Sequence, residues 1–110
     1  MDNLKIVITS FAEEEDAVEM ANKLLENNLA ACCNIFPGVK SFFRWENQLL
    51  NEVEILMLIK TREFAVKDVI RVLERDHPYD LPGIEVLSVE DASKDFQDWV
   101  NDETRNPKVL

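Results

Sequence analysis

The residues of this chain that could bind a metal or transfer a proton are few. Cys32 and Cys33 are sequence neighbours, and His77 is the only histidine among the 110 residues. Thiolate sulfur and imidazole nitrogen are suitable ligands for copper and zinc. Neighbouring residues on a strand point to opposite faces, however, which makes the two cysteines poor partners for one shared ion or for a disulfide. We therefore interpret them as small core or interface hydrophobes.

His77 has several acidic neighbours in sequence, Asp76, Asp80 and Glu85. One interpretation is a mixed nitrogen and oxygen metal site with His77 and Asp76 as its candidate ligands. The other is a histidine that is hydrogen-bonded at a helix end beside Pro78, since a single histidine rarely defines a transition-metal site. No nucleophile can be assigned to this histidine from the sequence, so we predict that the chain is not an enzyme.

A second set of candidate site residues combines aromatic and cationic side chains: Phe43, Arg44, Trp45, Lys60, His77 and Tyr79. In a groove between subunits, such groups would hold a small anion or a nucleotide-like ligand. In the alternative interpretation, the aromatic side chains anchor a subunit interface and the two cations pair with nearby glutamates, because interfaces are enriched in aromatics and arginine.

Hydrophobic periodicity predicts the elements that position these residues. In order, the expected elements are a strand over 4–9, a helix after a capping box at 10–13, strands over 31–46 and 53–61, a helix capped by Thr61, a strand over 84–89 and a helix capped by Asp91. The order β-α-β-β-α-β plus a C-terminal helix is the ferredoxin-like pattern of an α+β sandwich. We expect a single domain over residues 1–101, followed by a polar C-terminal tail over 102–110.

The two central strands predict an unusually long hairpin with its turn at Asn47–Asn51. Pro37-Gly38 predicts a bulge or kink in its first arm. Period-two alternation puts Phe43 and Trp45 on one face and Phe42 on the other, so large aromatics point both ways. One small chain cannot easily cover both faces, and we therefore expect a partner subunit to cover part of one.

The charge of the chain narrows the choice of partners. The formal net charge is −10, from 22 acidic and 12 basic residues, which disfavours nucleic acids and anionic membrane surfaces. Residues 1–5 lack the basic start and apolar run of a signal peptide. With two adjacent cysteines, these features favour a reducing cytoplasm.

Several segments, taken in order, resemble the CutA family, whose members are named for divalent-cation tolerance. The matching pieces are Ala30-Ala31-Cys32, Ser41-Phe42-Phe43-Arg44-Trp45-Glu46, Glu54, Ile59-Lys60-Thr61 and His77-Pro78-Tyr79, within residues 4–100. The resemblance implies a ferredoxin-like protomer in a tight homotrimer and a signalling or regulatory role in the response to divalent metal ions, copper in particular. It implies no known catalytic reaction.

The sequence departs from the family at three positions. Many members carry a cysteine, a second histidine and a glutamate where this chain has Thr9, Asp76 and Gly83. The resemblance therefore implies that a copper site built from those positions is weak or absent here. We also expect a positive φ at Gly83, after Pro82. The alternative function is a small-ligand sensor that resembles the trimeric PII-type proteins and binds an effector in clefts between subunits.

Overall fold

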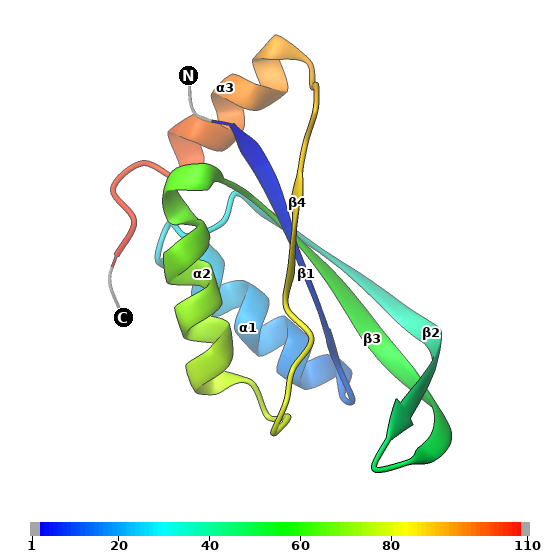
Figure 1. Cartoon of the computed structure of the whole chain (residues 1–110). Coiled ribbons are helices and arrows are strands. Elements are labelled where there is room, and N and C mark those ends of the chain that lie inside the picture. Colours follow the sequence, from blue (N-terminus) through cyan, green and yellow to red (C-terminus); the bar gives the residue numbers. More distant parts are fainter. Residues whose placement is uncertain (1–2, 109–110) are drawn as a thin grey trace.

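The computed structural model describes residues 3–108 and contains the predicted elements in the predicted order (Figure 1). They are β1 (Leu4–Phe11), α1 (Glu14–Glu26), β2 (Cys32–Trp45), β3 (Gln48–Arg62), α2 (Glu63–Asp76), β4 (Glu85–Ser88) and α3 (Lys94–Glu103). The four strands form one antiparallel sheet in the order β2-β3-β1-β4. This order confirms the predicted ferredoxin-like α+β fold.

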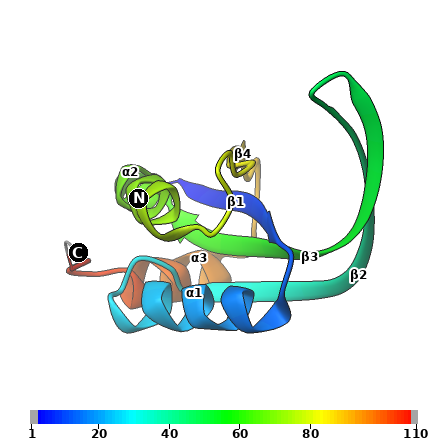
Figure 2. The same cartoon turned by 90° about the horizontal axis from the view of Figure 1, so that it is seen from below.

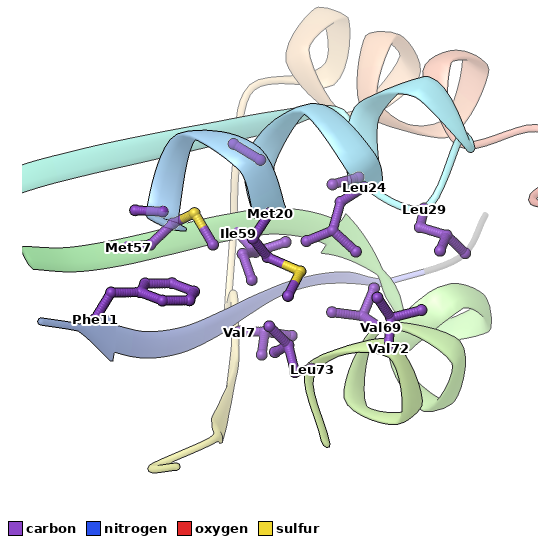
Figure 3. Packing of buried hydrophobic residues seen from close by; sticks show 13 residues of the cluster. Val7, Phe11, Met20, Leu24, Leu29, Met57, Ile59, Val69, Val72 and Leu73 are labelled. Carbon is purple, nitrogen blue, oxygen red and sulfur yellow. The ribbon is translucent and has the colours of Figure 1, made fainter. Parts of the chain in front are cut away.

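The main core lies between one face of the sheet and the helices α1 and α2 (Figure 3). Val7 and Phe11 of β1 and Met57 and Ile59 of β3 are completely buried there. The period-two pattern of these strands accounts for this, because alternate side chains share one face. The helices contribute their own buried residues: Ala17, Met20, Ala21 and Leu24 from α1, and Val69, Val72 and Leu73 from α2.

The helices begin differently from the prediction. Neither the capping box at 10–13 nor a Thr61 cap forms, since the residues before α1 and α2 are Glu13 and Arg62 and neither makes a side-chain capping bond. The reason is that β1 pairs with β3 along its whole length, from Leu4 opposite Arg62 to Phe11 opposite Ile55, and this pairing places Ser10 and Thr61 in the sheet. Thr61 instead donates its hydroxyl to the Leu29 carbonyl at 2.7 Å. The residue before α3 is Ser93, so the predicted Asp91 cap is also wrong.

The long hairpin is confirmed, with arms of 14 and 15 residues, but its turn is not where we predicted. Trp45 pairs with Gln48, which leaves only Glu46 and Asn47 in the turn, with φ of 49° and 65°. Two successive positive φ values are typical of a tight type I′ hairpin, whose twist matches that of the strands. The predicted bulge is confirmed, since the register shifts between Phe36 and Val39.

The outer half of the hairpin extends past the helices and curls away from α1 (Figure 2). Leu49 and Val53, near the tip of the hairpin, lie on the same side of β3 as the side chains that contact α1 and α2 near its base. Beyond the helices no other residue within 3–108 covers that face, so Leu49 is 75% exposed and Val53 65%, and Phe42 on the neighbouring strand is 76% exposed. The prediction that aromatics point both ways is confirmed.

The C-terminal segment is attached to the domain. Helix α3 runs to Glu103, two residues beyond the expected domain limit, and Thr104 is buried. The Lys108 amide donates to the Asn27 carbonyl at the end of α1. Residues 1–2 of the expected domain and 109–110 of the expected tail lie outside the described residues. No helix within residues 3–108 has the length and apolar character to cross a membrane.

Candidate functional site

A concave surface is formed by the curled hairpin and the loop after α2. We call it the hairpin groove, and it encloses about 470 Å³. Its lining residues are Ser10, Ser41, Phe43, Trp45, Leu50, Glu52, Glu54, Tyr79, Asp80, Leu81 and Gly83. This volume lies within the usual range of small-molecule sites.

Strand register explains why these side chains meet. Beyond the bulge, Ser41 pairs with Glu52 and Phe43 pairs with Leu50, so both pairs share one face of the hairpin. The curl makes that face concave (Figure 2). The loop that follows α2 then closes one side of the groove with Tyr79.

Glu54 is the most buried charged group in the groove, at 9% exposure. Its Oε2 accepts a hydrogen bond from the Tyr79 hydroxyl at 2.6 Å and one from the Ser10 hydroxyl at 3.2 Å. Burial alone would raise the pKa of this carboxyl, but hydrogen bonds from Tyr79, Ser41 and Ser10 outweigh it and hold the pKa below its usual value. Glu54 is therefore a charged, fixed carboxylate at neutral pH.

His77 lies under the groove, with both ring nitrogens in use. Its Nε2 lies 2.8 Å from the Ser10 carbonyl, and its Nδ1 accepts the Tyr79 amide at 3.1 Å. The ring therefore carries its proton on Nε2, where it can donate to the carbonyl. It also stacks on Phe11, with ring centroids 4.4 Å apart, and its burial lowers its pKa. This geometry favours the hydrogen-bonded helix-end interpretation, since a metal would have to displace one of these bonds.

Asp76 is engaged elsewhere. Its two carboxylate oxygens accept from Arg75 at 2.8 and 2.7 Å, and Lys23 donates to one of them at 2.9 Å. These bonds hold the pKa of Asp76 well below its usual range. Within residues 3–108, no three histidine, cysteine, aspartate or glutamate side chains gather into a group that could hold a metal ion.

The three departure positions differ in their surroundings. Thr9 is 2% exposed, and its hydroxyl has no hydrogen-bond partner among the described residues. Gly83 lines the groove, but the predicted positive φ is wrong, since only Gly38 among the described glycines has one. A Cβ placed at Gly83 would meet no atom within 4 Å. That edge of the groove is open.

The predicted aromatic and cationic set is only partly brought together. Phe43, Trp45 and Tyr79 line the groove. Lys60 lies toward the other end of β3, paired with Ile6, and its Nζ sits 5.9 Å from the Phe96 ring centroid. Lys60 therefore does not join the site within one chain.

Arg44 does not join the groove either. It pairs with Leu49 at the hairpin tip, on the face opposite Phe43 and Trp45. Within one chain, strand alternation and strand length thus separate both cations from the aromatics, and a cationic groove between subunits stays a prediction.

The cysteines are both free and half-buried. Burial raises the pKa of the Cys33 thiol to about 12, and Cys33 packs against the main core. At neutral pH it is therefore an unreactive thiol, in keeping with the interpretation as a small hydrophobe.

The acidic lining of the groove was missed by sequence reasoning. Glu52, Glu54 and Asp80 all line it, and none of them was in the aromatic and cationic set that we predicted for a groove. The sequence contained one indication of this acidic lining. Glu54 lies on the same face of its strand as Leu56 and Leu58, where the alternation favours an apolar residue. An acidic residue that interrupts an apolar pattern in this way indicates a candidate functional site.

Comparison with known proteins places the chain in a family. The sequence profile described as CutA1 divalent ion tolerance protein matches residues 5–103. The chain is 33% identical over 100 residues to the divalent-cation tolerance protein CutA of Thermus thermophilus, covering 91% of this chain and 97% of that protein.

Solved structures agree with this assignment. The divalent ion tolerance protein CutA1 of Ehrlichia chaffeensis superposes with a TM-score of 0.90 at 36% identity, covering 94% of this chain and 97% of the other. The periplasmic divalent cation tolerance protein CutA of Archaeoglobus fulgidus gives 0.89 at 34% identity, covering 93% and 99%. The chain belongs to the CutA1 divalent ion tolerance protein family.

Proposed function

We propose that this chain is a homotrimeric divalent metal ion tolerance protein that acts in the cytoplasm by binding and signalling rather than by catalysis. The family supports the link to metal tolerance, because the relatives carry that name. The absence of catalysis is supported by His77, whose two ring nitrogens bond to backbone groups and are not poised to move a proton for a substrate.

The main support for self-assembly is the exposed apolar face in the outer half of the hairpin. Phe42, Leu49 and Val53 are each at least 65% exposed on adjacent strands. Monomeric proteins rarely leave such apolar strips uncovered, and closed symmetric assemblies bury them. Further copies of this chain are the proposed cover.

Copper is the proposed metal, with weak affinity. Thr9 and Gly83 supply no strong ligand, and Asp76 is held by two cations. Isothermal titration of the full chain with cuprous and cupric ions, beside His77→Ala, tests this. Weak binding that His77→Ala leaves unchanged is expected. Tight stoichiometric binding lost in His77→Ala would contradict it.

Trp45→Ala tests the assembly. If Trp45 anchors an interface, its loss costs at least about 2 kcal/mol per interface and lowers the melting temperature more at low protein concentration. Melting curves at several concentrations measure this. A curve identical to that of the wild type would remove Trp45 from that role.

The hairpin groove favours the small-ligand sensor as a second candidate. Its volume suits a small molecule, but its carboxylates repel the nucleotide-like anions that the sequence suggested. Scanning fluorimetry against nucleotides and divalent ions separates the candidates. A shift with nucleotides alone would favour the sensor, whereas a shift with divalent ions alone supports metal tolerance.

The cytoplasmic location is supported by the free cysteine pair, which suits a reducing compartment. The Archaeoglobus fulgidus relative is described as periplasmic, so location varies in the descriptions of relatives. Fractionation of cells that produce the untagged chain tests the proposal, and recovery outside the cytoplasm would contradict it.

A further inference from the structure

The outer half of the hairpin carries charges of opposite sign on its two faces. Its concave face holds Glu52 and Glu54, and Asp80 joins them from the loop after α2. Alternation along β2 beyond the bulge places Lys40 and Arg44 on the convex face, where both are exposed. Strand alternation therefore separates the acidic side chains from the basic ones.

Neither set of charges is neutralised within the described chain. The salt bridges among residues 3–108 join other side chains, and none of them includes Lys40 or Arg44. None includes Glu52, Glu54 or Asp80 either. The two sets lie on opposite sides of a two-stranded ribbon, so one chain cannot bring them together.

The apolar residues and the shapes of the two faces are complementary as well. The convex face exposes Phe42, Leu49 and Val53, each by at least 65%. The concave face contributes Phe43 and Trp45 to the groove. The curl makes the first face protrude and the second recede (Figure 2). The convex face of one hairpin thus matches the groove of another in shape, in apolar surface and in charge.

The charges favour one way of stacking two such hairpins. Two concave faces brought together would oppose carboxylates, and two convex faces would oppose cations, so both isologous contacts are repulsive. Contact between a convex and a concave face is heterologous. A heterologous contact that is repeated around a rotation axis closes into a ring, and a trimer is such a ring.

We propose that the hairpin groove is completed by the next copy of this chain, whose convex hairpin face enters it and brings Arg44 to the carboxylate of Glu52. Phe42 and Leu49 of the entering hairpin then contact the aromatic wall that contains Trp45. This inference rests on the proposed homotrimer and specifies how its subunits meet. It also makes Trp45 an interface anchor, because the neighbour covers it.

Charge reversal tests the contact. Arg44→Glu and Glu52→Arg are each expected to raise the concentration at which half of the trimer dissociates by at least about tenfold, because each places like charges across the interface. Combining the two reversals in one chain restores opposite charges at every interface and is expected to return that concentration to within about threefold of the wild-type value. Sedimentation equilibrium of the full chain over a dilution series, at one fixed urea concentration, measures it.

Lys67→Glu is the matched control. It changes the net charge as Arg44→Glu does, but it lies on the exposed surface of α2 and is expected to leave the trimer unchanged. Equal weakening by Lys67→Glu overturns the proposed contact. A combined variant that dissociates as readily as the single variants overturns it too.

The same measurements separate this inference from the proposed function. A trimer that tolerates both single reversals overturns the inference, returns the groove to the small-ligand role and leaves the homotrimer intact. A wild-type chain that is monomeric at micromolar concentration contradicts the homotrimer itself, and the proposed contact with it.

Discussion

The two halves of the β2–β3 hairpin differ in what covers their apolar side chains. Near its base, Met57 and Ile59 are completely buried beneath α1 and α2. Near its tip, Leu49 and Val53 continue the same face of β3 and remain mostly exposed. The same face of one strand thus belongs to the core in its inner half and is exposed to solvent in its outer half. The chain supplies helices only for the first half, and the second is available to partners and ligands.

The largest expected effect comes from the inner half. Met57→Ala removes a fully buried side chain and is expected to cost about 2–5 kcal/mol of unfolding free energy, because a cavity remains in the core. Urea unfolding at several protein concentrations measures it.

Leu49→Ala is the control on the same strand face. We expect its effect to be small at high protein concentration and to grow on dilution, because it acts through association. Equal, concentration-independent losses from both variants would abolish the distinction between the halves.

The next largest effect on stability is expected from the hydrogen bond between Tyr79 and Glu54, which joins the loop after α2 to the hairpin. Tyr79→Phe removes the hydroxyl that donates to Glu54 and is expected to destabilise the protein by about 1–3 kcal/mol, since a buried carboxylate loses a partner. Thermal and urea unfolding measure this. A stability equal to that of the wild type would show that the groove is not tied to the body through this bond.

The pH dependence of stability tests the packing of His77. Its pKa is lowered in the folded state, so the unfolded chain binds the proton first as pH falls below about 6.5. Stability is therefore expected to fall as pH drops below that value, by at most about 1.4 kcal/mol per pH unit for one proton.

Urea unfolding between pH 7.5 and 5.5 measures this slope, which His77→Gln is expected to reduce. A slope of the opposite sign would indicate that folding raises the histidine pKa, in conflict with its buried stacking on Phe11.

The smallest expected effect is at the open edge of the groove. Gly83→Glu meets no atom at its Cβ, and surface changes of this kind usually alter stability by less than about 0.5 kcal/mol. A large loss of stability would show that the edge at Gly83 is not free.

The element order was predictable from sequence because each signal is local. Period-two runs and helical stripes marked every strand and helix, and Pro37-Gly38 marked the bulge at its correct place. The turn was missed because Glu46 is an unusual residue at positive φ, whereas the polar run 47–51 had the composition of a loop. Strand pairing then extended β3 into that run.

The site was less predictable because it depends on nonlocal geometry. The contact of Tyr79 with Glu54 joins residues 25 positions apart, and the curl of the hairpin decides that they meet. The same geometry separates Lys60 and Arg44 from the aromatic residues that we had grouped with them. Alternation predicted the face of Phe43 and Trp45 correctly, but it carried no information on what would lie opposite.

Analytical ultracentrifugation of the full-length chain at micromolar concentration tests the central claim most directly. The proposed homotrimer predicts a single sedimenting species with the mass of three chains. A stable, compact species with the mass of one chain would contradict this account of the hairpin.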